Sequence, residues 1–180
     1  MPRYVALLRA VNLGGDTTRR SVDLRTAVEG DPIRDVRTVL QSGNLVFDAP
    51  ARAAGELERE IERRLAARFA RPTVVFVRTA AEWLELLAGN PYRAEAARDP
   101  AHLLLTVTKR EPPAAAWPRL RAVIVGRERF TPGPRCAYLV YPDGIGTSKL
   151  TSARIELALG APVTARNWNT VGRLAALLED

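Results

Sequence analysis

Cysteine, lysine and histidine are scarce in this chain, and long apolar runs are missing. The single cysteine, Cys136, cannot form an internal disulfide, which favours a reducing, cytoplasmic location. No apolar run approaches the roughly 18 residues of a membrane-spanning helix, so no membrane partner is expected. The apolar stretch near the N-terminus is too short for a signal peptide and meets Arg9 at once. We therefore expect a globular cytoplasmic protein.

Positive charge is plentiful, but it comes almost entirely from arginine. The chain holds 25 arginines and two lysines, and its formal net charge is +7. Residues 1–90 carry a net charge of +2 and residues 91–180 one of +5, so the excess favours the second half. No block of five like charges occurs in the sequence. General attraction to polyanions is expected, whereas a dedicated basic arm for nucleic acid is not.

The first half of the sequence has the order β-α-β-β-α-β. Apolar runs predict strands at 4–8 and 73–77, alternation predicts a hairpin over 35–48 that turns at 41–44, and helical periodicity predicts helices over 21–29 and 53–69. This order is the ferredoxin-like arrangement, a four-stranded sheet with two helices on one face. We therefore predict a ferredoxin-like α+β domain over residues 1–90.

The second half also mixes strands with helices. Thr79 and Glu82 form a capping-box pattern that starts a helix, and residues 91–100 have the composition of a linker. Strands are predicted at 102–108 and 136–141, a hairpin across 122–131, and helices from about Thr147 and from about Thr170. We therefore predict a second small α+β domain over residues 91–180, and an α+β fold class for the whole chain.

One polar stretch, residues 141–150, combines two glycines with a lysine. Gly144 and Gly146 permit turns that a β-carbon would block. Ser148 and Lys149 are expected where a helix begins, and the unpaired amides and positive dipole end there attract anions. The spacing excludes a Walker A phosphate loop, which needs four residues between its glycines and a glycine directly before the lysine. The alternative is a plain strand-to-helix turn with a hydroxyl cap.

A second polar stretch, residues 164–170, precedes the last predicted helix. Arg166, Asn167 and Asn169 surround the indole of Trp168 with hydrogen-bond donors, which suits an anionic ligand. The alternative is that these side chains cap the last helix and bind loop carbonyls, because buried loops need their backbone groups satisfied.

Further candidate ligand-binding residues lie in the first half. Arg9 and Asn12 follow the first strand, where a glycine loop exposes polar groups at a sheet edge. Gln41, Ser42 and Asn44 fill the predicted hairpin turn, and their alternative role is turn chemistry. We predict that polar residues from both halves converge in a cleft between the two domains, namely Arg9, Asn12, Gln41, Lys149 and Arg166.

Four stretches together resemble the bacterial DUF1697 family, which is named for an unknown function. They are Leu7-Leu-Arg-Ala-Val-Asn-Leu-Gly-Gly15, Gln41-Ser-Gly-Asn-Leu-Val-Phe47, Tyr141-Pro-Asp-Gly-Ile-Gly-Thr-Ser-Lys-Leu150 and Ala165-Arg-Asn-Trp-Asn-Thr-Val171. The resemblance spans roughly residues 3–178. It implies two α+β domains, the first of them ferredoxin-like, and it implies no reaction.

The sequence offers little material for catalysis. His102, the only histidine, opens an apolar strand without an obvious carboxylate partner, and Cys136 has no histidine for a dyad. No cluster has metal-ligand spacing, and no cofactor is predicted. Ser42 and Ser148 would need a base that the sequence does not show. The sequence leaves open whether the chain is an enzyme.

Three classes of function remain open. The first is a protein, or an enzyme of unidentified chemistry, that binds an anionic or phosphate-bearing small molecule between its two domains. The second is a nucleic-acid-binding protein that uses the sheet of its ferredoxin-like domain. The nearly neutral charge of the first half is an argument against this class. The third is an interaction protein whose polar stretches hold the domain interface together. The sequence does not indicate an oligomeric state.

Overall fold

The computed structural model describes residues 1–9, 17–39 and 43–179, and it contains two compact units. The first unit comprises Met1–Glu85 together with Arg173–Asp180, and the second comprises Leu86–Gly172. The chain therefore passes between the units twice, once within a helix near residue 85 and once within the last helix. The limits of 1–90 and 91–180 drawn from the sequence stay a prediction.

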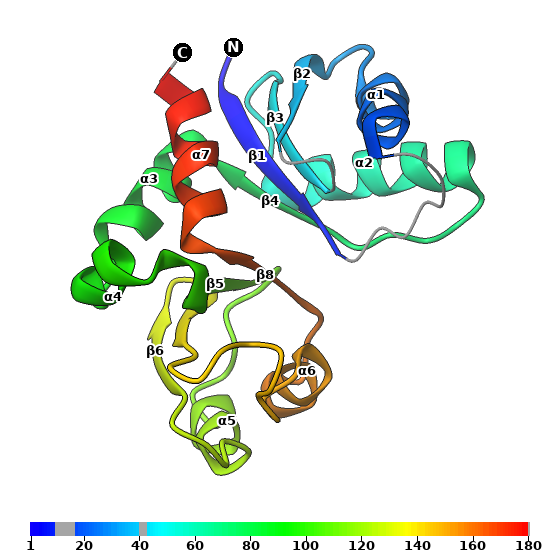
Figure 1. The fold of residues 1–180 in the computed structure, drawn as a ribbon. Coiled ribbons are helices and arrows are strands. Elements are labelled where there is room, and N and C mark those ends of the chain that lie inside the picture. The colour runs from blue at the N-terminus through cyan, green and yellow to red at the C-terminus, as the bar shows by residue number, and fades with distance from the viewer. Residues whose placement is uncertain (10–16, 40–42, 180) are drawn as a thin grey trace. The chain divides into compact units, whose positions relative to one another are not determined.

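The first unit follows the predicted β-α-β-β-α-β order (Figure 1). Its elements are β1 (Arg3–Leu8), α1 (Thr17–Val28), β2 (Arg34–Thr38), β3 (Asn44–Asp48), α2 (Ala54–Phe69) and β4 (Val75–Thr79). The four strands form an antiparallel sheet in the order β2-β3-β1-β4. The predicted β2–β3 hairpin is confirmed, whereas α1 begins at Thr17 rather than at the expected cap, Ser21.

The core of the first unit lies between α1, α2 and one face of the sheet. Alternate residues of β1 face it, from Tyr4 to Leu8, because side chains alternate along a strand. Helix α2 contributes Leu57, Ile61 and Leu65, spaced by four residues on a single helix face as the sequence predicted. The ring of Tyr4 stacks on that of Phe47 at 5.5 Å between centroids.

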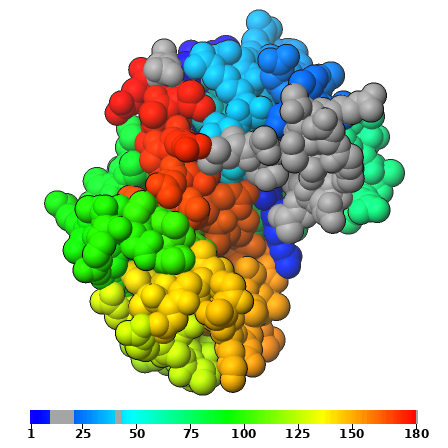
Figure 2. Space-filling view, viewed as in Figure 1, coloured from blue at the N-terminus to red at the C-terminus, as the bar shows by residue number. Residues whose placement is uncertain are grey.

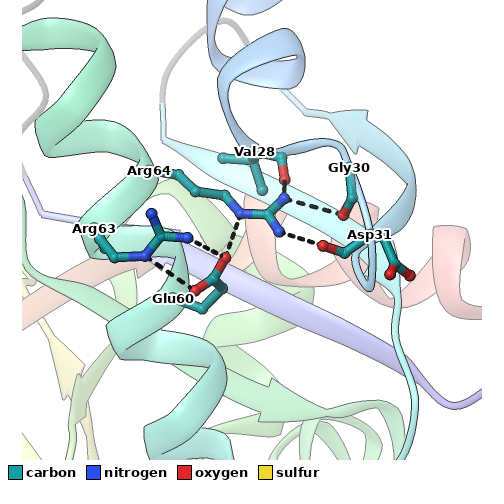
Figure 3. A network of polar contacts seen from close by, with 6 residues as sticks. All are labelled: Val28, Gly30, Asp31, Glu60, Arg63 and Arg64. Carbon is teal, nitrogen blue, oxygen red and sulfur yellow. Dashed lines mark hydrogen bonds and ion pairs between the residues drawn. The ribbon is translucent and has the colours of Figure 1, made fainter.

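Arg64 of α2 joins the two helices of the first unit. Its guanidinium donates to the carbonyl of Val28 at the end of α1 at 2.5 Å, and to the carbonyls of Gly30 and Asp31 at 3.0 and 2.8 Å. Glu60, one turn earlier, accepts from Arg64 Nε at 2.6 Å and fixes the guanidinium plane (Figure 3). A helix end leaves carbonyls without intrahelical donors, so one side chain satisfies both the end of α1 and the turn after it.

The second unit repeats the connectivity of the first. Its elements are α4 (Arg93–Arg98), the short 3₁₀ helix η1 (Pro100–His102), β5 (Leu103–Thr108), α5 (Ala116–Ala122), β6 (Arg129–Gly133), β7 (Cys136–Val140), α6 (Ser152–Leu159) and β8 (Val163–Asn167). The strand order, β6-β7-β5-β8, is antiparallel throughout and equals that of the first sheet, element for element. Two α+β units with the same strand order are therefore present.

Each unit ends in a helix that follows its last strand directly. Helix α3 (Ala80–Ala88) follows β4, and the predicted capping box is present: Thr79 Oγ1 accepts from the Glu82 amide at 3.1 Å and Glu82 Oε2 accepts from the Thr79 amide at 2.9 Å. Helix α7 (Trp168–Glu179) follows β8. The far end of α3 belongs to the second unit, where the Leu86 carbonyl accepts from the Tyr138 hydroxyl at 2.7 Å. The far end of α7 belongs to the first, where Arg3 donates to the Leu177 carbonyl.

Three expectations about the second half were wrong. Residues 122–125 form no strand, because α5 extends to Ala122, and β6 instead forms its hairpin with β7. Residues 91–100 contain α4 rather than an extended linker. Residues 163–167, read as part of a loop, form the edge strand β8, paired with β5. The strand was missed because threonine, arginine and asparagine interrupt its apolar pattern.

In both units, glutamates of the helix before the last strand accept hydrogen bonds from amides on the outer edge of that strand. The helices are α2 and α6, and the strands are β4 and β8. The outward amides of Val75 and Val77 in β4 donate to Glu62 and Glu58 of α2 at 2.9 and 3.0 Å. In the second unit, the amide of Val163 in β8 donates to Glu156 of α6 at 3.0 Å. Unpaired edge amides are a template for unwanted strand pairing. The carboxylates satisfy three of these amides and so make the edges less open to another strand.

We expect Glu58→Ala to lower the free energy of unfolding of the first unit by about 1–2 kcal/mol, because it leaves the Val77 amide without this acceptor. Glu58 is 5% exposed, so water has little access to take its place. Glu58→Gln keeps a carbonyl acceptor and should lose less. Urea unfolding of the three proteins measures the difference, and equal stability of Glu58→Ala and wild type would contradict this role.

Candidate functional site

The two polar stretches singled out in the sequence leave the second sheet at the same edge. Strands β7 and β8 both pair antiparallel with β5, so they run parallel to each other. Val140, at the end of β7, faces Leu103 at the start of β5, and Asn167, at the end of β8, faces Leu104. We call this the His102 edge, defined by the start of β5 and the ends of β7 and β8. Residues 141–150 begin there, and the stretch 164–170 passes along β8 and leaves the sheet there after Asn167.

The loop of residues 141–150 is held mainly by contacts within the second unit. The buried hydroxyl of Tyr141 donates to the Leu150 carbonyl at 3.1 Å, which closes the loop. The Ser148 hydroxyl donates to the Glu128 carboxylate and accepts from the Leu150 amide at 3.0 Å. Asp143 forms an ion pair with Arg127. These bonds support the structural alternative for Ser148.

The expected helix start at 147–149 was wrong. Helix α6 begins at Ser152, because the Thr151 hydroxyl, not that of Ser148, accepts an amide of the first turn, from Arg154. Lys149 is exposed and lies in the turn before this helix, with its carbonyl accepting from the Thr151 amide at 3.0 Å. Lys149 therefore does not lie in the first turn of a helix. The argument for an anion site at Lys149 from the amides of a helix N-terminus no longer applies.

Ionisation in this loop follows from its contacts. The hydrogen bond from Arg127 lowers the pKa of Asp143, and the hydrogen bond from Ser148 lowers the pKa of Glu128. Burial, followed by the Glu128 charge, raises the pKa of Tyr141 to about 12. At neutral pH both carboxylates are therefore charged and the phenol is neutral.

The second stretch runs from the end of β8 into α7. The Asn167 Oδ1 accepts from both the amide and the hydroxyl of Thr170 at 3.0 Å, so this side chain caps α7, as the structural alternative predicted. Arg166 donates to the Thr164 hydroxyl and the Ala165 carbonyl, both at 2.8 Å. Its burial lowers the pKa of Arg166 to about 10. Asn169 is exposed in the first turn of α7.

Sequence reasoning missed the partner of the only histidine. His102 Nδ1 lies 2.7 Å from Asp99 Oδ2, which corrects the expectation that His102 lacks a carboxylate. The two residues bracket the η1 turn, whose three-residue repeat places positions i and i+3 on one side. The sequence Asp-Pro-Ala-His carries that spacing, and a proline-initiated turn could have signalled it. The carbonyl of His102 accepts from the Tyr141 amide at 2.9 Å, which ties the pair to β7.

A pocket of about 180 Å³ opens beside this pair. Its wall carries Arg98 of α4 and Arg129 of β6, and Arg129 pairs with Glu95 at 2.6 Å. The hydrogen bond from Arg129 lowers the pKa of Glu95. Its remaining lining comes from Val140, Tyr141 and Pro142, where β7 enters the polar loop. Figure 2 shows the green segment that holds α4 adjoining the yellow segments of the second unit.

The remaining predicted residues belong to the first unit. Arg9 is exposed after β1, with its amide bonded to the Val74 carbonyl at 2.9 Å. Asn44 is 4% exposed and its Nδ2 donates to the Val39 carbonyl, which fits the turn-chemistry alternative. Asn12, Gln41 and Ser42 lie outside the described residues. Convergence of these residues with Lys149 and Arg166 stays a prediction.

A metal-binding cluster and a membrane-spanning helix are both absent from the described ranges. Residues 1–9, 17–39 and 43–179 contain no cluster of three histidine, cysteine, aspartate or glutamate side chains placed to hold a metal ion. In the same ranges, no helix has the length and apolar character to cross a membrane. Cys136 is buried in β7 as a thiol, without a disulfide.

The order of the elements and the pairing of the strands define an α+β protein of two units with the same connectivity. The chain belongs to the DUF1697 family of proteins of unknown function, whose model matches residues 1–138. The charged residues of the pocket fall within that match, whereas both polar stretches lie beyond it. The resemblance noted from the sequence is thereby confirmed.

One solved structure shares the fold over its whole length. It is described as the conserved bacterial protein SP0830 from Streptococcus pneumoniae, and it matches with a TM-score of 0.70 and 17% sequence identity, covering 100% of this chain and 99% of the other. At this identity the likeness concerns the fold alone. No curated protein matches the chain.

Proposed function

We propose that the chain binds a small anionic ligand in the pocket at the His102 edge of the second unit. The observation that carries the proposal is a positively charged side chain, Arg98, that lines a pocket together with the Asp99–His102 pair. Both polar stretches that the sequence singled out leave the sheet at this edge, the first after Val140 and the second after Asn167. Grouped polar side chains in a concave site are the usual form of a ligand pocket.

The pocket offers an anion an exposed guanidinium. Glu95 is paired with Arg129, and Asp99 accepts from His102. Arg98 interacts with Glu95 electrostatically but without a close ion pair, so its guanidinium donors face a ligand in the pocket. A guanidinium binds carboxylate or phosphoryl oxygens through two parallel hydrogen bonds.

The size of the pocket limits the ligand. A drug-sized molecule fills roughly 300–1,000 Å³, whereas this pocket measures about 180 Å³. We therefore propose a compact anion, or the charged end of a larger molecule whose remainder stays outside. Single-stranded or duplex nucleic acid would be held in such a pocket only by a terminal group.

A second candidate function has an observation in its favour. Ser148, Asp143 and Asn167 are bound by Glu128, Arg127 and Thr170. These internal contacts support the alternative in which the polar stretches hold the protein together and the chain serves as an interaction protein. Anion binding separates the two candidates, because a purely structural role gives no anion-dependent stabilisation.

We expect phosphate or sulfate to raise the melting temperature of the wild-type protein, because a ligand that binds only the folded state stabilises it. Arg98→Gln should weaken this binding roughly tenfold or more, since a charge-assisted hydrogen bond is lost. Arg93→Gln is the matched control: Arg93 is an exposed arginine of the same helix that does not line the pocket.

A thermal-shift titration of the three proteins with phosphate, sulfate and citrate makes the measurement. The proposal is wrong if wild type shows no anion-dependent shift, or if both variants respond as wild type does. Fluorescence anisotropy with short RNA and DNA should show binding no tighter than that of the small anions.

A further inference from the structure

We infer that His102 is itself a ligand-binding residue, and that its protonated Nε2 donates to a phosphoryl group held against Arg98. This inference rests on the proposed function and names its ligand class. It assigns the Asp99–His102 pair a task in recognition, and it makes the affinity of the pocket dependent on pH.

Asp99 determines which imidazole nitrogen faces the ligand. With Asp99 Oδ2 at 2.7 Å, Nδ1 carries the hydrogen, because an ionised carboxylate can only accept. The His102 amide also donates to the Asp99 carbonyl at 3.1 Å, so one turn of backbone holds both side chains in place. Nε2 is then the nitrogen that gains or loses a proton.

Nε2 is open to a ligand because the neighbouring loop residue is a glycine. Gly144 has φ +89°, and a β-carbon built on it would lie 3.7 Å from His102 Nε2. That is an ordinary van der Waals distance, so only backbone of this residue lies beside the nitrogen. Among the described residues Asp99 is the only hydrogen-bond partner of the imidazole. The polar loop therefore passes beside Nε2 without covering it.

The charged groups around the imidazole leave one net positive charge for the ligand, that of Arg98. Helix α4 contributes Arg98 and Glu95, and β6 contributes Arg129, which neutralises Glu95. On β7 and its loop, Tyr141 is neutral, and Asp143 is paired with Arg127. With Asp99 offset by the protonated imidazole, Arg98 remains; the Nε2–H then adds a second, directed donor.

Two converging donors, one of them a guanidinium, suit a phosphoryl dianion better than a carboxylate. A phosphate monoester carries between one and two negative charges near neutral pH, with three acceptor oxygens. A carboxylate carries one charge and two oxygens, which Arg98 alone can satisfy. The third oxygen of a phosphoryl group is the acceptor that Nε2–H would bind.

Binding and protonation are then linked. A ligand that binds only the protonated imidazole favours that state, and protonation favours the ligand by the same free energy. An ordinary imidazole titrates near pH 6.5, to within about a unit in proteins. Affinity should therefore fall as the pH rises through that range. Sulfate is the sharper probe of the protein, because it keeps its double charge where phosphate itself titrates.

The only histidine of the chain gives the test a single, assigned signal. We expect saturating sulfate to move the titration midpoint of the His102 C2 proton to higher pH, as followed by NMR. The wild-type Kd for sulfate should rise roughly tenfold between about pH 5.5 and about pH 8. His102→Gln should bind sulfate weakly with no such dependence. Acetate should bind wild type more weakly than sulfate at the lower pH.

Two further variants separate the roles. Arg98→Gln should weaken sulfate binding at every pH yet keep the pH dependence. Arg93→Gln should match wild type. The inference is overturned if sulfate binds wild type and His102→Gln equally at all pH values. That outcome would leave the proposed anion site at Arg98 unaffected. Absence of sulfate and phosphate binding by wild type at any pH overturns both.

Discussion

Phe47→Ala is expected to lower the free energy of unfolding of the first unit by about 3–5 kcal/mol, the largest effect of any single change considered. Phe47 is fully buried in β3, and its ring stacks on Tyr4 of the neighbouring strand with 16° between the ring planes. Alanine removes the whole ring and leaves a cavity that α2 on one side and the sheet on the other can fill only by shifting. The stack is lost as well.

Hydrogen exchange of strand amides, combined with urea unfolding, makes this measurement unit by unit. Amides of β1 and β3 should lose protection in Phe47→Ala. Leu120→Ala, at a fully buried position of the second unit's core, is the matched control and should lower protection in β5 and β7 instead. Phe47→Leu should lose less than half as much, and it remains informative if Phe47→Ala fails to fold. A loss below about 1 kcal/mol at Phe47 would contradict the described packing.

Arg64→Met is expected to cost the first unit about 2–3 kcal/mol, although the position is on the helix surface. Methionine keeps most of the aliphatic stem but removes the donors that serve Val28, Gly30 and Asp31. The Arg64 side chain is 14% exposed, so water restores only part of this bonding. Arg63→Met is the control: Arg63 is 68% exposed and contacts Glu60 alone, a pair typically worth 0–1 kcal/mol.

The same network predicts how stability responds to acid. Hydrogen bonds from Arg63 and Arg64 lower the pKa of Glu60 below its ordinary value near 4.5. A lowered carboxyl pKa stabilises the folded state above the ordinary value, and that contribution is lost as pH falls through the lowered one. In Arg64→Met the pKa of Glu60 should rise towards 4.5, so acidification should cost this variant less stability than wild type, and the difference between the two proteins should narrow as the pH falls below 4.5. Urea unfolding at a series of pH values below 5 checks both statements, and unchanged stability in Arg64→Met at neutral pH would refute the first.

Local patterns in the sequence predicted the elements that have strong periodicity. Helix α2 was found because Leu57, Ile61 and Leu65 repeat every four residues, and the start of α3 because Thr79 and Glu82 form a reciprocal cap. Both features are decided within one or two turns of chain. The β-α-β-β-α-β order of the first half followed from summing such local signals.

Elements decided by tertiary contacts escaped prediction. Strand β8 carries Thr164 and Arg166 among its few apolar residues, and only its pairing with β5 makes it a strand. Several neighbouring hydroxyls could have capped α6, and the structure uses that of Thr151. The Ser148 hydroxyl instead donates to Glu128, twenty residues away in the sequence. No window of sequence shows that competition.

The candidate site was predicted in part. The polar stretches at 141–150 and 164–170 were recognised as unusual, and the chain leaves the sheet at one edge in both of them. Their centre, the Asp99–His102 pair, was missed because His102 was treated as the first residue of a strand rather than the last of a 3₁₀ turn. A boundary error of one residue was enough to hide the imidazole's partner.

The passage of the last helix from the second unit to the first has a consequence for biosynthesis. Residues 173–180 complete the first unit, yet they leave the ribosome after every residue of the second unit. The second unit is continuous in sequence, so all of its residues are synthesised before the first unit receives its final segment. Although domains generally fold in the order in which they are made, the unit begun first here is the one finished last, and its nascent form must wait through the synthesis of its entire neighbour.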